Sequence, residues 1–450
     1  MARSRSIILA RSAQSFVGFL LLLGIGFITL VPLGFLILNS FNTSQLGQEI
    51  SWGFEGWRQA FGAPQTIKAL IYSVLLSART FLGLAVAFLV SWLLIRVRIP
   101  ASPFIEFSLW MAWFLPPLSV TIGWIALLDP HHGLINVLLA HVLPIAIRLN
   151  IYSFSGILWV HLTLLTVPVM TILLTPAFRQ MDASFEESAR TCGSGPLRTL
   201  RRIVLPLLWP TVLVVTIATF IRSLEAFEIE QIIGIPAGIY VYGTRIYDLV
   251  RWDPPLYSQA MALSTIFLFV LFGAVLVYQR SYRHHEFATL RPGGASFRPA
   301  LIGKWRYFAS GWLILWIAVS IYLPLAMVLI GSFMKFFGMF GLQQPFTIQH
   351  WAAVLGDPAF TSALQNSLIM GFSVAGVGVV VYSVLGYLIL RGRFVGRATL
   401  SLLVWIPWAI PGILLGLSLL WIFLSVRFFN FLYGTMFVLI FSVVLKDMPI

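Results

Sequence analysis

Four ionisable side chains lie within or at the end of apolar runs, where a charge is costly unless it faces protein or water. They are Arg79, Arg222, Glu225 and Glu228. Along a polar passage the two acids would attract a cation, and the two arginines an anion or a chelate. The alternative is structural, since Arg222 can pair with either acid, and Arg79 with another buried partner. We favour the structural interpretation, and we expect Glu230 to be solvated near the outer surface.

Motifs for catalysis or cofactor binding are sparse. His131 and His132 beside Asp129 are the one candidate for enzyme chemistry, and loop residues of this kind are usually solvated. No lysine follows a glycine and precedes Ser or Thr as a Walker A motif requires. We therefore expect no catalytic residue, no metal site, no cofactor and no enzyme activity, so that any ATP hydrolysis must come from another subunit.

The composition is that of a membrane protein. Hydrophobic residues make up 59% of the chain and charged residues 10%, against about half and about a quarter in a soluble domain. The net charge of +14 does not indicate nucleic-acid binding, because the basic residues cluster at the ends of apolar runs. The single cysteine, Cys192, excludes an internal disulfide.

Apolar runs long enough to cross a bilayer recur along the chain, since a membrane-spanning helix needs about 20 residues. The expected spans are 15–39, 67–95, 103–128, 152–178, 206–227, 258–279, 307–332, 362–390, 399–424 and 433–450. The pattern predicts an all-α polytopic membrane protein with ten spans.

The basic residues orient these spans. Arg3, Arg5 and Arg11 precede the first run, which we expect to remain as a signal anchor with its N-terminus in the cytoplasm. If the spans then alternate, most of the 29 Lys and Arg residues fall in cytoplasmic loops. This distribution satisfies the positive-inside rule.

The sequence contains an internal repeat. Residues 57–62 (WRQAFG) match 351–356 (WAAVLG), and Pro116 matches Pro411 at nearly the same offset. Both copies are predicted to run in the same orientation across the membrane. Parallel repeats of this kind are typical of transporters, in which the pathway lies at the interface between the two repeats.

A polar segment, 281–306, separates the repeats and contains a Pro-Gly-Gly breaker at 292–294, so it is predicted to be a cytoplasmic linker. The predicted organisation is an N-terminal anchor helix and outer loop at 1–66, a first helical bundle at 67–280, the linker, and a second helical bundle at 307–450.

The segment 181–206, between the fourth and fifth spans, contains residues that predict its local structure. Ser184 followed three residues later by Glu187 is a capping box, which predicts the start of a short surface helix. Gly193 would end this helix by adopting the left-handed backbone conformation. Pro196 suits the first turn of a second helix that returns to the bilayer.

This segment resembles a loop of the permease subunits of binding-protein-dependent ABC importers, which reads Glu-Ala-Ala, three residues, Gly, nine residues, Ile-x-Leu-Pro. The matching positions are Glu187, Ala189, Gly193, Ile203, Leu205 and Pro206, and Ser188 replaces the first Ala. In that family the loop forms a coupling helix, which sits in a cleft of the ATPase. By the resemblance, Glu187 would meet a basic group of the ATPase. Small Ser188 and Ala189 would allow close approach, and Gly193 would permit the turn.

The resemblance implies a type I ABC importer permease fold in the bacterial inner membrane, with two tandem bundles of parallel topology. It also implies an ATPase subunit, expected as a homodimer, and a periplasmic or extracellular solute-binding protein, but no nucleic acid. Pro168 matches Pro449, so the counterpart of Glu187 would fall beyond the last residue. The second permease unit is therefore expected to be incomplete at its C-terminus.

Two questions of function stay open at this point. As a fused double permease, the chain most resembles the permeases for ferric iron. Residues 227–247 also look like the iron type, so ferric iron is the expected substrate. Thiamine, a polyamine or another small solute is the alternative. A secondary transporter could share the parallel repeats, but it would leave the segment 181–206 without a role.

Overall fold

A computed structural model of the protein describes residues 2–44, 49–97, 99–142, 148–284, 303–338, 343–392, 394–409 and 412–448. Within these ranges the chain is helical, and its extended pairings are two isolated bridges, Asn42 with Trp52 and Met334 with Phe346. The described helices include seven that are long and apolar enough to cross a membrane, or up to nine if each of two bent pairs is one span. The predicted all-α class is confirmed.

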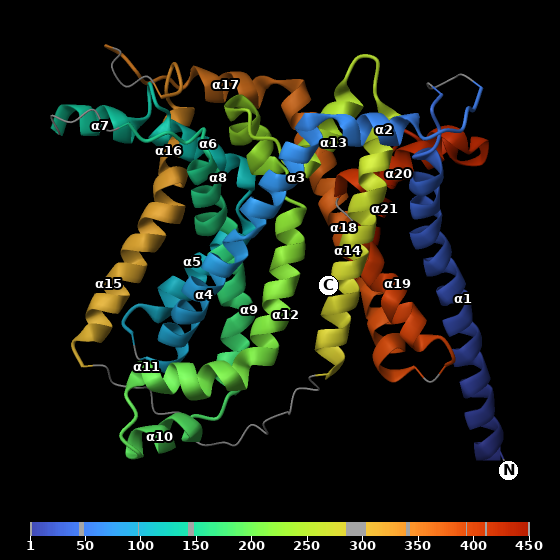
Figure 1. Cartoon of the computed structure of the whole chain (residues 1–450), viewed down its shortest axis with the longest axis horizontal. Helices are drawn as coiled ribbons and strands as arrows, with labels where there is room; N and C mark the ends of the chain where they lie inside the picture. The colour runs from blue at the N-terminus through green and yellow to red at the C-terminus, as the bar shows by residue number, and fades with distance from the viewer. Residues whose placement is uncertain are drawn as a thin grey trace. The chain divides into compact units, whose positions relative to one another are not determined.

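Seven of the predicted spans correspond to long apolar helices or helix groups (Figure 1). They are α1 (Ala2–Asn39), α3 (Pro64–Ser77) with α4 (Arg79–Arg96), α8 (Phe154–His161) with α9 (Val167–Gln180), α11 (Pro196–Thr199) with α12 (Leu205–Leu224), α14 (Tyr257–His284), α15 (Trp305–Ile317) with α16 (Leu323–Ser332), and α18 (Pro358–Arg391).

The predicted spans 103–128 and 399–424 are not single straight helices. In the first, α5 (Ser102–Phe114) and α6 (Pro117–Leu128) meet at 104°. Leu115 and Pro116 are extended between them, with ψ of 132° and 126°. Proline lacks the N–H that a helix needs and disfavours helical ψ in the residue before it, which explains the break.

The second half contains a similar bend. Helices α19 (Arg397–Ala409) and α20 (Gly412–Ser425) form a pair that bends by 100°. Pro411, the repeat partner of Pro116, lies outside the described residues, as does Pro449. The last predicted span contains the short apolar helix α21 (Met436–Lys446).

Shorter helices connect the long ones. They are α2 (Glu55–Gly62), α7 (Leu134–Val142), α10 (Ser184–Thr191), α13 (Tyr242–Arg251) and α17 (Gln349–Gly356).

The chain divides into two compact units. Unit 1 comprises Met1–Ile67, Arg245–Val275 and Val354–Ile450, and unit 2 comprises Lys68–Thr244 and Leu276–Ala353. Within unit 1, α1 packs on α19 and α20, and within unit 2, α15 and α16 pack on α5 and α6. Each unit therefore contains helices from both sides of the predicted linker.

This grouping differs from the order of the repeats along the chain. The bundles predicted at 67–280 and 307–450 rest on the internal repeat, and they stay a prediction, because duplication and spatial packing are different properties. The predicted linker is only partly visible, since 285–302 lie outside the described residues.

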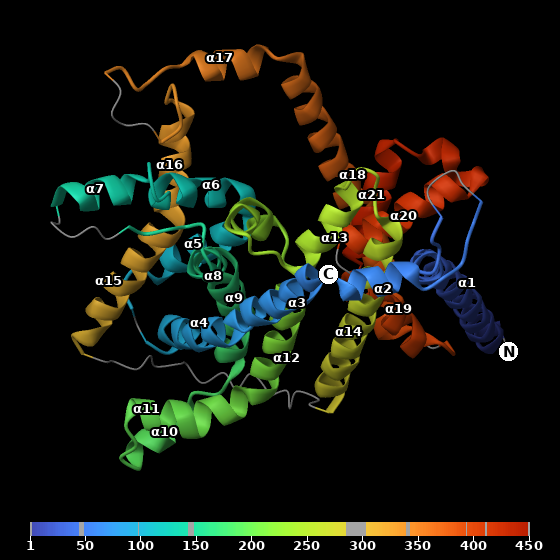
Figure 2. The ribbon, with the colours of Figure 1, turned by 45° about the horizontal axis from the view of Figure 1, so that its top comes forward.

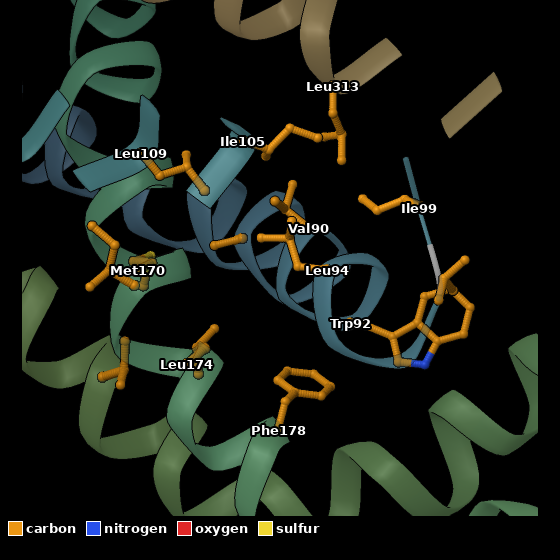
Figure 3. Close-up of a cluster of buried hydrophobic side chains, with 14 of the residues drawn as sticks. Val90, Trp92, Leu94, Ile99, Ile105, Leu109, Met170, Leu174, Phe178 and Leu313 are labelled. Atoms are coloured by element: carbon orange, nitrogen blue, oxygen red, sulfur yellow. The ribbon is translucent and has the colours of Figure 1, made fainter. Parts of the chain in front are cut away.

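One of the two hydrophobic cores described in unit 2 lies where α4, α5, α9 and α15 meet. Figure 3 shows Val90, Ile105, Leu174, Phe178 and Leu313 among the side chains buried there. Burying a large apolar side chain stabilises a fold by about 1.5–3 kcal/mol. This core ties α4 to α9 and so fixes the end of α9 from which the segment 181–206 emerges.

Candidate functional site

The segment 181–206 forms a short helix, a turn and a returning helix at one end of unit 2 (Figure 2). Helix α10 spans Ser184–Thr191, and α11 begins at Pro196 and continues through a π-helical turn, Leu200–Val204, into α12. Proline at the first position of α11 removes an N–H that would have had no partner within the helix. The local order of elements is that predicted from the sequence.

The start of α10 differs from the predicted capping box. The side chain of Ser184 does not cap the helix; instead Oδ1 of Asp182 accepts a hydrogen bond of 2.9 Å from the backbone N–H of Ser184. Asp offers its side-chain oxygen to a backbone N–H two residues later in this way in many turns. The helix therefore begins where expected, with a different residue supplying the oxygen.

The end of α10 agrees with the prediction for Gly193, which has φ of +76°. Its N–H donates to the carbonyl of Arg190, and the N–H of Ser194 donates to the carbonyl of Ala189, each at 2.9 Å. This pair of bonds is the Schellman arrangement, which requires a left-handed residue and favours glycine.

Helix α10 has two different faces. Glu187 and Ser188 are exposed, whereas Glu186 and Ala189 are 4% and 7% exposed and face the interior of unit 2. Ala189 is therefore not at the surface that a partner could approach. Further along the loop, the predicted positions Ile203 and Leu205 are half-buried and Pro206 is exposed.

A buried ion pair, which the sequence interpretation did not identify, holds the inner face of α10. Nε of Arg96 lies 2.8 Å from Oε1 of Glu186, and the two side chains are 2% and 5% exposed. Nη2 of Arg96 also donates to the carbonyl of Met181 at 2.6 Å. Burial raises the pKa of the Glu186 carboxyl, although Arg96 and Arg190 act to lower it.

A second buried cluster contains one of the predicted pathway residues. Arg79, His161 and Glu230 are 3%, 4% and 0% exposed. Nε2 of His161 is hydrogen-bonded to Oε1 of Glu230 at 2.7 Å, and Arg79 interacts electrostatically with Glu230. Nη1 of Arg79 donates to the carbonyl of Leu76 at 2.8 Å.

The expectation that Glu230 is solvated was therefore wrong. Glu230 begins a π-helical turn, Glu230–Gly234, and His161 immediately precedes another, Leu162–Thr166. No spacing in the sequence relates His161 to Glu230, because their contact depends on how α8 packs beside the segment after α12. The cluster supports the structural interpretation of Arg79, which has an acidic neighbour.

The remaining candidates for the pathway lie at the end of α12 and just after it. Nη1 of Arg222 lies 3.2 Å from Oε2 of Glu225, one helical turn away, and Glu228 is exposed. Nη2 of Arg79 donates weakly, at 3.5 Å, to the carbonyl of Ser223, so Arg79 lies beside the same helix end. A direct role of these residues in transport stays a prediction.

The histidine pair lies in the turn that follows α6, where Asp129 organises the backbone. Oδ1 of Asp129 accepts hydrogen bonds from the backbone N–H groups of His131 and His132, at 2.8 and 2.9 Å. The carboxylate thus organises a turn. Among the described residues, no group of three or more His, Cys, Asp or Glu side chains is placed to hold a metal ion.

Comparison with known proteins shows a family similarity for the middle part of the chain. Residues 79–289, which include α10 and both buried clusters, match the family described as "binding-protein-dependent transport system inner membrane component". This part of the chain is therefore similar to the inner-membrane components of binding-protein-dependent transport systems.

Individual relatives carry similar names. A probable ABC transporter permease protein of Sinorhizobium fredii is 28% identical over 64% of this chain and 50% of its own length. A putative ferric transport system permease protein of Haemophilus influenzae is 25% identical over 74% of this chain and 52% of its own. The chain thus spans about half the length of the curated relatives it matches.

Other relatives are named for the transport of different substrates. Permeases for molybdenum, sulfate and spermidine/putrescine transport also match parts of the chain. A solved bacterial ABC transporter involved in the import of alginate aligns with a TM-score of 0.49 and 19% identity, over 63% of this chain and 97% of that one. The curated relatives named here are permease proteins, in agreement with the expectation that the chain is not an enzyme.

Proposed function

We propose that the chain forms the membrane pathway of an ATP-driven importer and is coupled to a separate ATPase through the segment 181–206. The observation that carries this proposal is the outer face of α10 and its turn. Glu187 is exposed on this face, and Phe185 of the same helix and Leu197 of α11 are 41% and 78% exposed. Large apolar side chains exposed in the same segment as an exposed charge are typical of a surface that binds a partner.

The rigidity of this surface supports the same role. Gly193 ends α10 with a defined turn, and Arg96 and Glu186 hold the opposite face of the helix inside the protein. A helix that must transmit force needs such fixed ends. The ATPase is proposed as a homodimer, and the N-terminus of the permease is proposed to lie on the same, cytoplasmic side of the bacterial inner membrane.

The substrate is proposed to be ferric iron, delivered by a solute-binding protein on the outer side. Support comes from the relatives named as ferric transport permeases in Haemophilus influenzae and Actinobacillus pleuropneumoniae. Polyamine and other permeases also match, so a polyamine, thiamine or another small solute is the alternative substrate.

The coupling proposal is tested by ATP hydrolysis of the permease and ATPase in lipid, with and without loaded binding protein. Glu187→Ala removes the exposed carboxylate and is expected to lower the stimulated rate about tenfold, because a charged partner at an interface is lost. Glu55→Ala, another exposed glutamate, is the control and should leave the rate unchanged. Stimulation that is equal in both variants would contradict the proposal.

The same assay distinguishes the substrates and the alternative class. Binding proteins loaded with ferric iron, thiamine or putrescine are compared, and the one that stimulates hydrolysis identifies the substrate. Uptake into vesicles without any ATPase, driven by an ion gradient, would instead indicate a secondary transporter and would overturn the ABC importer proposal.

A further inference from the structure

The connection between α9 and α10 is short and non-helical. Helix α9 ends at Gln180, and α10 begins at Ser184, so three residues, 181–183, join them. Met181 has extended backbone, with ψ of 129°. Because no helix continues through these three residues, they can act as a hinge when a partner pushes on α10.

Arg96 spans this hinge. One guanidinium nitrogen, Nη2, donates to the carbonyl of Met181 on the hinge, and another, Nε, contacts Glu186 in α10. Arg96 is itself the last residue of α4. The planar guanidinium holds its nitrogens in a fixed relation, so the two contacts fix the orientation of α10 relative to α4.

Helices α4 and α9 are in turn joined tightly. The rings of Phe88 and Phe178 are 5.0 Å apart, and the hydroxyl of Ser91 donates to the carbonyl of Thr171 at 3.2 Å. Close-packed interiors transmit displacement with little deformation. A rotation of α10 should therefore carry α4 and α9 with it as long as Arg96 holds the hinge.

We propose that Arg96 and Glu186 are positioning residues that lock the 181–183 hinge, so that force applied to the outer face of α10 moves α4 and α9. This inference rests on the proposed function for its transport consequence. Glu186 and Glu187 then have separate roles on opposite faces of one helix: Glu187 meets the partner, and Glu186 connects the helix to the bundle.

The hinge itself can be tested on the full chain without any partner. Cys192 is the single cysteine and is exposed, and Leu173→Cys provides a second exposed site on α9. Spin labels at these two positions report the orientation of α10 as a distance distribution. Glu186→Ala, or Arg96→Lys, which keeps the charge but loses the two-nitrogen geometry, should broaden that distribution.

A matched control is available in the same unit. Glu106 forms an ion pair of 2.6 Å with Arg179, but the two side chains are 31% and 56% exposed, so this pair does not lie buried across the hinge. Glu106→Ala should leave the label distances as in the wild type. Unchanged distances in Glu186→Ala and Arg96→Lys would overturn the inference.

The consequence for coupling is read from transported solute per ATP hydrolysed. Arg96→Lys and Glu186→Ala should still bind the ATPase, because Glu187 is intact, and should lower this ratio at least about fivefold. A merely structural role would lower transport and hydrolysis together and leave the ratio unchanged, which would overturn the inference. If wild-type permease binds no ATPase, the proposed function fails, whereas the label distances still decide whether Arg96 locks the hinge.

Discussion

At the scale of single residues, the buried ionisable side chains described in unit 2 lie next to one another rather than alone. His161 and Glu230 are hydrogen-bonded, with Arg79 near the same carboxylate, and Arg96 contacts Glu186. A charge in a low-dielectric interior needs such partners, since its desolvation is costly. These residues stabilise the positions of the segments that carry them.

His161→Leu is expected to destabilise the protein by about 3 kcal/mol, because it removes the hydrogen bond that His161 makes to the buried carboxylate of Glu230. Thermal unfolding in detergent, followed by tryptophan fluorescence, measures the change. His132→Leu is the control, since His132 is exposed and contributes its backbone N–H to the bond with Asp129. Equal unfolding temperatures for the two variants would contradict a stabilising role for the His161 contact.

At the scale of elements, short sequence signals account for where helices begin, bend and end. Pro116 breaks the helix between α5 and α6, and Gly193 ends α10 in a left-handed turn. The signal at the start of α10 was misassigned, because Asp182 and Ser184 both carry an oxygen that can accept from a backbone N–H. The sequence therefore predicted the helix α10 but did not decide which of these two side chains accepts the hydrogen bond at its start.

Gly193→Ala should weaken the end of α10, because a Cβ in the left-handed region costs about 1–2 kcal/mol. Hydrogen exchange of the backbone amides in α10 should become faster. Gly195→Ala is the matched control, since Gly195 has φ of −71° and no atom within 4 Å of an added Cβ. Faster exchange in both variants would mean that the conformation of Gly193 is not the cause.

At the scale of the whole molecule, each compact unit contains helices from both halves of the repeat. In unit 2, α16 packs on α6 so closely that a Cβ on Gly123 would collide with the backbone of Pro324. The glycine therefore permits an approach between helices that are far apart in the sequence.

Gly123→Ala is expected to push α6 and α16 apart and to destabilise unit 2 by about 1–3 kcal/mol, the usual effect of overpacking. Thermal unfolding measures the loss. Gly311→Ala in α15 is the control, because nothing lies within 4 Å of a Cβ added there. If Gly123→Ala were as stable as this control, the close packing of α6 on α16 would be refuted.

The sequence by itself determined the membrane class, most spans, the short helix of the segment 181–206 and its stop at Gly193, because these depend on hydrophobicity and on neighbouring residues. Only the tertiary structure decided that Glu186 contacts Arg96, that Glu230 is buried against His161, and that α16 packs on α6. Those contacts join residues distant in the chain, and helical periodicity contains no information about which distant faces meet.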